Sequence, residues 1–475
     1  ALVLALVMSM SLVTISNAAF KDADKIDYTE AVDVMNAVGV LIGDENGNFN
    51  PKENLTRAQA AKIISYLLLG NKTAEGLAGS GKFTDVAKTS WAAGFVDYCA
   101  AVGVVNGMGN GKFDPNGSLT TLQFAKMLLV ALGYDAKIEG FVGTDWSINV
   151  SAKANQVGLL NGLDVGANAT LTREQAAKMC LNTLKAPLVE YDTKGSTITI
   201  GGTVIGIGGS KATYVTATVA EDSTVKNIGK TQLTNTGAYT VELGEKLFSN
   251  LKLNSATDAF ERPASKWTIK STEIGTYVNT PDLTYTEAVK LGTIYSDLAL
   301  SDSIKKGAVE FVMDGAASEA GFAADGTTAL SGLAITKGNS TKIGGNGVLV
   351  EVYYDDVANT AKVILVNTYA GEVTSARAKT ASKDANVTVT PLNAARGGVY
   401  ETEDFKVDDA VTYNYSNKAG DTGVKNVAKA EQVTGTLTGY SSSSVVVGGT
   451  TYKFNKAASI DTSALAGAID NDVTL

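Results

Sequence analysis

A set of short motifs occurs three times in the first 190 residues, and this repetition constrains the fold more than any other feature. Each copy has a Val-Gly pair, and the glycines of these pairs are Gly39, Gly103 and Gly158, spaced 64 and 55 residues apart. Internal similarity at such a period indicates structural units that bury their apolar faces against one another. The sequence therefore predicts three packed units, at residues 20–78, 79–136 and 137–187.

Each unit has the pattern of a helix, a glycine-rich loop and a second helix. Apolar residues recur at helical spacing before each Val-Gly glycine, and glycine there supplies the left-handed conformation of a helix end. The second helices start at capping boxes, Thr56 with Gln59, Thr120 with Gln123 and Thr172 with Gln175. We expect a compact all-α domain with grooves where neighbouring units meet.

The order of these motifs resembles a known family. Phe83-Thr-Asp-Val, Trp91-Ala, Val102-Gly-Val-Val-Asn-Gly107, Phe113-Asp-Pro115 and Leu55-Thr-Arg-Ala-Gln-Ala-Ala61 match the pattern of the S-layer homology (SLH) domain, which normally occurs as a triplet. The resemblance covers about residues 20–187. It implies a pseudo-threefold helical fold that binds secondary cell-wall polysaccharide, often pyruvylated, non-covalently in the grooves between repeats.

In that family an arginine of the second helix and a tryptophan of the first helix help to form the groove. The arginines at these positions are Arg57 and Arg173, and the tryptophans are Trp91 and Trp146. An arginine can pair in a bidentate manner with a carboxylate such as a pyruvyl ketal, and an aromatic face packs on a sugar ring. Loop glycines allow close backbone approach to a ligand. The loop candidates, with their polar neighbours, are Gly43, Gly107, Gly162, Asp44, Asn106 and Asn161.

Two departures from the family pattern reduce the expected number of binding grooves. Repeat two has Thr121 in place of the motif arginine, and repeat one has Asp27-Tyr28 in place of the tryptophan. We therefore expect at most two competent grooves. Simpler interpretations also exist: the arginines could be solvated surface charges, the tryptophans core residues, and the glycines turn residues.

The chain begins with an apolar run followed by small residues, which is typical of a secretory signal peptide over residues 1–18. The run is too short for a membrane span, which needs about 20 residues. We expect a secreted protein held at the cell wall. In an exported chain, Cys99 and Cys180 could form a disulfide, but both fall on apolar helix faces, which favours buried free thiols.

The composition argues against several classes of function. The formal net charge of −9 is unsuited to nucleic acid, and the chain has no histidine, the commonest general base and metal ligand. No cofactor, metal or catalytic motif is expected. Asp44-Glu-Asn-Gly-Asn48 is not an EF-hand loop, because Phe49 and Leu55 occupy the positions that need glycine and a carboxylate.

After residue 187 the helical pattern gives way to β-branched runs separated by Gly, Asn and Asp. Hairpins are expected at 197–205, 348–367 and 445–454. The fold class is α+β multidomain: an all-α SLH triplet followed by all-β, hairpin-rich sandwich or barrel-like modules, with provisional bounds 188–270, 271–375 and 376–475.

The leading hypothesis is a structural, non-enzymatic S-layer or surface-array protein that is anchored to wall polysaccharide and associates with copies of itself. The alternative is an anchored extracellular enzyme, such as a polysaccharide hydrolase, or an adhesin.

Overall fold

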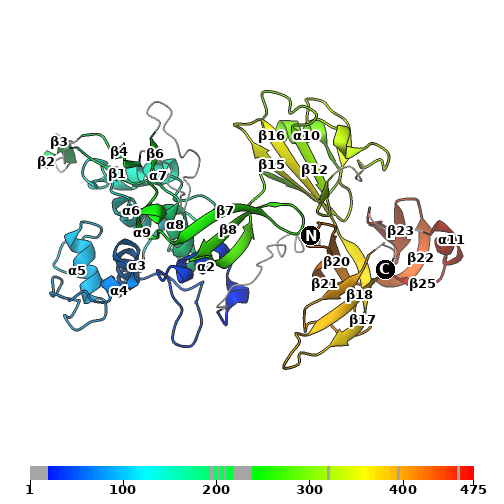
Figure 1. The fold of residues 1–475 in the computed structure, drawn as a ribbon, viewed down its shortest axis with the longest axis horizontal. Helices are drawn as coiled ribbons and strands as arrows, with labels where there is room; N and C mark the ends of the chain where they lie inside the picture. Colours follow the sequence, from blue (N-terminus) through cyan, green and yellow to red (C-terminus); the bar gives the residue numbers. More distant parts are fainter. Residues whose placement is uncertain are drawn as a thin grey trace. The chain divides into compact units, whose positions relative to one another are not determined.

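The computed structural model of the chain describes residues 20–192, 196–200, 203–207, 210–217, 238–317, 321, 323–392, 396–456 and 461–475 (Figure 1). These residues divide into a helical unit, 20–254 with 266–276, and a β unit, 255–265 with 277–475. The predicted signal peptide at 1–18 lies outside the described residues. Within the described ranges, no helix has the length and apolarity to cross a membrane.

The helical unit contains the three predicted helix pairs: α2 (Thr29–Ala37) with α3 (Arg57–Leu69), α5 (Ala93–Ala101) with α6 (Thr121–Ala131), and α7 (Trp146–Gln156) with α8 (Arg173–Leu184). A 3-10 turn, η1 (Ala23–Lys25), and a short helix, α4 (Asn71–Ala74), flank the first pair. All three second helices begin at complete capping boxes, as predicted. The Val-Gly glycines have φ values of 73°, 78° and 75°, in the left-handed region that glycine favours.

Backbone hydrogen bonds between the capping segments close the three pairs into a ring. The N–H of Leu55 donates to the carbonyl of Leu171 at 2.8 Å, Leu171 to Leu119 at 2.9 Å, and Leu119 to Leu55 at 3.1 Å. Each pair supplies one donor and one acceptor, so these buried groups are satisfied only when all three pairs are present.

The helices also pack in a cyclic order. Helix α3 packs on α5, α6 on α7, and α8 on α2. We call these contacts the first, second and third interfaces. They are equivalent in position, so differences between them arise from side chains.

The core of the helical unit draws apolar side chains from every pair. Fully buried members include Phe49, Phe113, Phe124, Phe141, Leu55 and Ile64. Cys99 and Cys180 are buried free thiols, as the sequence indicated. Burial raises the pKa of the Cys99 thiol to about 11, which keeps it protonated and unreactive near neutral pH.

The helical unit continues beyond α8 with short elements. They are β1 (Val189–Glu190), β2 (Ser196–Ile200), β3 (Thr203–Ile207), β4 (Thr213–Tyr214), β5 (Thr216–Ala217), β6 (Tyr239–Thr240) and α9 (Leu243–Leu247). Strands β2 and β3 form the hairpin expected at 197–205, with Ile200 paired to Thr203. Three longer strands, β7 (Leu251–Thr257), β8 (Pro263–Ile269) and β9 (Thr272–Val278), form a sheet in that order.

The first sheet of the β unit has the order β10-β15-β16-β12-β13. Its strands are β10 (Leu283–Tyr285), β12 (Val309–Met313), β13 (Ala316–Ala317), β15 (Val348–Asp355) and β16 (Thr360–Asn367). The predicted 348–367 hairpin is its centre. Around the sheet lie β11 (Val289–Lys290), α10 (Leu291–Asp297), η3 (Leu330–Gly332) and β14 (Lys342–Ile343).

Two further sheets follow. The order β19-β18-β17-β20-β21 comprises β17 (Tyr369–Arg377), β18 (Asn386–Pro391), β19 (Gly398–Tyr400), β20 (Ala410–Ser416) and β21 (Gly423–Lys429). Its edge strands β19 and β21 contact each other, so the sheet curls around its valine-rich core. The last sheet contains β22 (Thr434–Tyr440), β23 (Ser444–Val447), β24 (Thr450–Lys453) and β25 (Asp472–Thr474), with α11 (Thr462–Gly467) before β25.

The expectation that everything after residue 187 is all-β was wrong in detail. Helices α9, α10 and α11 interrupt the strands, and β12 pairs with β16 in parallel. A parallel pair needs a long crossover, which local hairpin patterns do not reveal. The range 376–475, expected as one module, contains most of one sheet and all of another.

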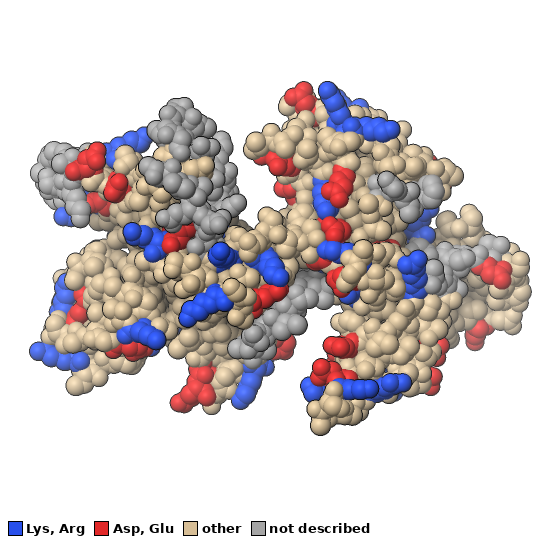
Figure 2. Space-filling view, in the orientation of Figure 1, with Lys and Arg blue, Asp and Glu red and all other residues tan. Residues whose placement is uncertain are grey.

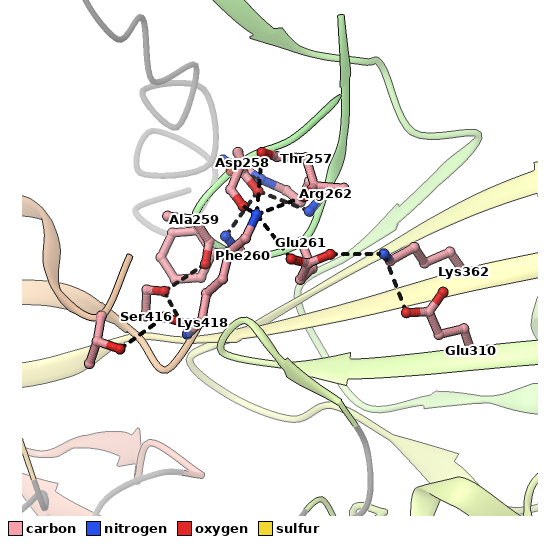
Figure 3. Close-up of polar contacts among 11 residues, drawn as sticks. Thr257, Asp258, Ala259, Phe260, Glu261, Arg262, Glu310, Lys362, Ser416 and Lys418 are labelled. Carbon is pink, nitrogen blue, oxygen red and sulfur yellow. Dashed lines mark hydrogen bonds and ion pairs between the residues drawn. The ribbon is translucent and has the colours of Figure 1, made fainter. Parts of the chain in front are cut away.

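A cluster of charges fixes the segment between β7 and β8 to the sheets of the β unit (Figure 3). Arg262 is 2% exposed and pairs with Asp258 at 2.7 Å and with Glu351 at 3.7 Å. Next to it, Glu261 accepts from Lys418 at 2.9 Å and from Lys362 at 3.4 Å. Because these charges pair with one another, we interpret the cluster as a structural ion-pair network that attaches this segment to the sheets.

Candidate functional site

A pocket of about 370 Å³ opens at the second interface of the helical unit. All three helix pairs contribute to it. Its lining consists of Arg57, Val104, Val105, Asn106, Leu119, Gln123, Lys126, Met127, Phe141, Val142, Gly143 and Trp146. Three of the sequence candidates, Arg57, Asn106 and Trp146, therefore come together here from three different repeats.

The position of Arg57 follows from its place at the start of α3. Its Nε donates to the carbonyl of Phe113 at 2.8 Å, its Nη2 donates to the carbonyl of Asn106 at 3.0 Å, and the guanidinium carbon lies 4.5 Å from the Phe113 ring centroid. These contacts hold the guanidinium in one orientation. Arginine has five N–H donors in total, so donors beyond these two bonds can serve a ligand.

Lys126 and Trp146 face each other across the second interface. Lys126 lies on α6 with its Nζ 5.7 Å from the Trp146 ring centroid, and Trp146 is the first residue of α7. Trp146 is half-buried, which leaves part of its ring exposed toward the pocket. A cation beside an aromatic face suits a ligand that presents both an anionic group and an apolar sugar face.

The charges of this pocket are not neutralised within the described part of the chain. No described carboxylate lies within ion-pair distance of Arg57 or Lys126. Burial lowers the pKa of Lys126, and burial also lowers that of Arg57 although Asp114 and Asp85 oppose it. An anion bound between these cations would offset that cost.

On the face shown in Figure 2, basic and acidic side chains are interspersed over the described surface, and neither kind forms one broad patch.

Arg173 repeats the geometry of Arg57 at the equivalent position. Its Nε donates to the carbonyl of Phe49 at 2.9 Å, its Nη2 donates to the carbonyl of Ile42 at 3.1 Å, and it lies 5.0 Å from the Phe49 ring centroid. Trp91 is 59% exposed at the first interface, with Lys62 6.0 Å from its ring centroid. Neither residue lines the pocket.

The cation of the first interface has an internal partner. Lys62 pairs with Glu75 at 3.0 Å, and Glu75 also accepts from the hydroxyl of Tyr66. Burial acts to lower the pKa of Lys62, but its contacts with Tyr66 and Glu75 raise it overall. The first interface thus offers a less available cation than the second.

The loop candidates outside the pocket have local structural roles. Asp44 accepts from the N–H groups of Asn46 at 2.9 Å and Asn48 at 2.8 Å. A Cβ at Gly43 would lie 2.7 Å from the Phe20 ring, and one at Gly107 would lie 2.6 Å from the Phe83 ring. These glycines are thus required by close packing of an aromatic ring.

The remaining two candidates belong to the third loop. Gly162 has φ 70°, a value that favours glycine, and the carbonyl of Asn161 accepts from Asn182 at 2.9 Å. Neither lines the pocket.

Sequence reasoning missed Lys126 and the apolar wall formed by Val105 and Met127. A signal was present for the lysine. Each repeat has an Ala-Lys pair at the same place in its second helix, Ala61-Lys62, Ala125-Lys126 and Ala177-Lys178. A charge repeated within an apolar stripe indicates a groove position.

Known proteins are similar to this chain in its helical repeats and over longer ranges. The model of the S-layer homology domain matches residues 19–61 and 82–125. A "Cell surface protein" of Thermoanaerobacter kivui is 28% identical over 95% of this chain and 54% of its own length. A "Surface layer protein" of Brevibacillus choshinensis is 27% identical over 40% of this chain and 17% of its own length.

A third relative, a "Cellulosome-anchoring protein" of Acetivibrio thermocellus, is 35% identical over 22% of this chain and 23% of its own length. The chain thus spans about half the length of the first of these relatives and less than a quarter of the other two. The chain carries S-layer homology domains within residues 19–125, has surface-layer and cell-surface homologues, and is a secreted protein of the cell surface.

Proposed function

We propose that this chain anchors a surface-layer ectodomain non-covalently to a secondary polysaccharide of the cell wall, with the pocket at the second interface as the principal binding site. The observation that carries the proposal is the convergence of Arg57, Lys126 and Trp146 on one pocket without a described anionic partner. The helix pair at 137–187 is a third, divergent repeat in this proposal. Its capping box and its part in the ring of leucine hydrogen bonds support that assignment.

The chemistry of the pocket suits a sugar that carries a carboxylate, such as a pyruvyl ketal. The outward N–H groups of Arg57 would donate to the carboxylate, and Lys126 would add a second positive charge. Trp146 would pack on the apolar face of the ring, and the side chain of Asn106 would bond hydroxyl groups. The valine and methionine side chains that line the pocket would exclude water and strengthen these polar contacts.

The first interface is a weaker site in this proposal. It retains an exposed tryptophan, and the groove arginine of the neighbouring repeat is also present. Its lysine, however, is engaged by Glu75 at 3.0 Å. A ligand there would have to compete with that carboxylate for the cation, so we propose one strong site and one weaker site per anchor.

The test is binding of the full chain to purified cell walls, with the secondary polysaccharide in place and after its chemical removal. We expect binding to disappear with the polysaccharide. Arg57→Ala and Lys126→Ala should each weaken binding about tenfold or more, because each removes charge-assisted contacts worth about 1.5–3 kcal/mol. The matched control is Lys112→Ala, which removes an exposed lysine from the repeat that also contains Lys126. Undiminished binding to stripped walls, or equal losses in all three variants, would contradict the proposal.

We also propose that the β unit associates with copies of itself in a surface array, which is the role that the names of the surface-layer relatives suggest. Negative-stain microscopy of the purified chain should show sheets or ordered patches. Dispersed single particles at every protein concentration and ionic condition would count against the array and favour an anchored adhesin or enzyme.

A further inference from the structure

The third interface is formed by an equivalent helix pair but lacks the arginine and the tryptophan of the second. Its lysine, Lys178 on α8, is the counterpart of Lys126, and the charge of Glu30 attracts it. Thr121 stands where Arg57 stands in the first repeat, and it is 1% exposed. Its hydroxyl donates to the carbonyl of Gly166 at 3.0 Å, so it holds the loop between α7 and α8 in place. No guanidinium therefore extends from this position over the groove.

The tryptophan position of the third interface is also occupied differently. It is taken by Asp27, whose carboxylate pairs with Lys52 at 2.5 Å. Lys52 also pairs with Glu174, and Glu174 accepts from the N–H of Asp27 at 2.8 Å. These groups satisfy one another and leave no unpaired charge in the cluster for a ligand.

A tryptophan does contact this interface, but it comes from strand β8. Trp267 is fully buried, and its indole Nε1 donates to Glu30, in the first turn of α2, at 2.7 Å. Lys185, at the end of α8, lies 5.4 Å from the centroid of its ring and pairs with Glu30 at 3.6 Å. The indole is thus held by one residue from each of the two helices that form the third interface.

We propose that the third interface is a docking site for the chain's own strand β8, with Trp267 as the docked group and Glu30 and Lys185 as its receptor. Equivalent interfaces of the helical ring then have two different functions. The second recognises a carboxylate-bearing sugar, and the third holds strand β8, in which the chain returns to the helical unit. The docking holds whether or not the pocket binds glycan, so it can be tested separately from the proposed function.

Two physical arguments support a specific docking. A buried indole N–H requires an acceptor, and an ionised carboxylate is a stronger acceptor than a neutral one. A half-buried carboxylate in turn is stabilised by a cation and by donors, and Glu30 has both in Lys185 and Trp267. Trp267, Glu30 and Lys185 therefore satisfy one another, and removal of the indole would leave Glu30 with one partner fewer.

The test is hydrogen exchange of the full chain, followed at the backbone amides of β8 and β9. Trp267→Ala should speed exchange in residues 266–276 by about tenfold or more, since it removes the packing and the hydrogen bond that oppose local opening. Trp267→Phe keeps an aromatic ring but loses the N–H, so its effect should be smaller. Lys266→Ala, which breaks an exposed ion pair with Glu273 on the same sheet, should leave exchange unchanged.

Calorimetry of the same variants with a methyl glucoside that carries a 4,6-O-pyruvyl ketal completes the test. We expect the number of sugar equivalents per chain to be unchanged by Trp267→Ala. An additional equivalent in that variant would overturn the proposal, because the interface would then be a masked sugar groove. Unchanged exchange in both Trp267 variants would overturn it as well. Far-UV circular dichroism shows whether each variant is folded. If Trp267→Ala is unfolded, Trp267→Phe carries the test.

Discussion

The second and third interfaces of the helical unit share a backbone arrangement and differ in the side chains at their groove positions. At the second interface, Arg57 and Lys126 face a pocket without a described carboxylate partner. At the third, threonine replaces the arginine, and Asp27, Lys52 and Glu174 pair with one another. The fold depends on capping boxes and a ring of backbone hydrogen bonds, which every repeat has kept. Ligand chemistry depends on a few positions that each repeat can change independently.

The largest effect is expected from reversing the charge at Arg57. Arg57→Glu replaces a donor for a carboxylate with a group that repels it, so wall binding should fall by about a hundredfold or more. Thr121→Glu at the equivalent buried position should lower stability without a comparable specific loss of wall affinity in the folded fraction. Sedimentation of the chain with purified walls, corrected for the folded fraction, measures both. Equal affinity losses would erase the distinction between the interfaces.

A buried carboxylate beside the third helix pair should give the helical unit a pH-dependent stability. Glu242, the N-cap of α9, is fully buried, and its Oε2 has no hydrogen-bond partner among the residues that the structure describes. Burial, with Glu245 nearby, raises its pKa to about 8. The folded state thus holds a proton that the unfolded chain releases near its usual carboxyl pKa, so stability should fall as pH rises from about 4.5 to about 8 and then level off.

Glu242→Gln should remove this part of the pH dependence and stabilise the unit above pH 7, because the neutral amide has no proton to lose on burial. Urea unfolding followed by tryptophan fluorescence reports on the helical unit, because all three tryptophans of the chain lie in it. Glu190→Gln, at an exposed carboxylate on β1, is the control. An unchanged pH slope in Glu242→Gln would refute the assignment.

Restoring the motif arginine at the third interface should not restore a binding site. Thr121→Arg must place a long side chain at a buried position, so we expect a loss of stability of about 1–3 kcal/mol from overpacking. It should add no sugar equivalent in calorimetry, because no tryptophan faces it in the same way and the charge of Glu30 already attracts Lys178, the counterpart of Lys126. Thr121→Ser, which keeps the hydroxyl, is the control. A second strong equivalent in Thr121→Arg would mean that arginine alone defines a groove.

The three capping threonines should behave alike despite the different interfaces. Thr56→Ala, Thr120→Ala and Thr172→Ala each remove one N-cap hydrogen bond, which costs about 1 kcal/mol. Urea midpoints from tryptophan fluorescence should shift by similar amounts in all three, and the serine variants should shift little. A cap that differed strongly from the others would show that the ring is less symmetric than its hydrogen bonds suggest.

The helical pairs were predictable because their signals are local and repeated. A capping box spans four residues, and the glycine that ends each first helix is marked by its neighbours. Arg57 and Trp146 were predicted from the resemblance to the S-layer homology domain, and Asn106 from its place beside a loop glycine. Lys126 was overlooked because a lysine within an apolar stripe was interpreted only as part of a helix face.

The contacts that escaped prediction join segments far apart in the chain. Trp267 and Glu30 are separated by 237 residues, and nothing in either local pattern points to the other. The parallel pairing of β12 with β16 joins Val309 to Ala361 and has no hairpin turn to mark it. In the β unit, local alternation predicted hairpins correctly, while the sheet order depends on long-range packing.

The central claim is that one interface of the ring, the second, holds the principal wall-glycan site. The most direct measurement is calorimetric titration of the full chain with the pyruvylated methyl glucoside, for the wild type, Arg57→Ala and Arg173→Ala. We predict that Arg57→Ala removes the strongest binding equivalent while Arg173→Ala leaves it in place. Loss of the strongest equivalent in Arg173→Ala, with Arg57→Ala indistinguishable from the wild type, would contradict this account.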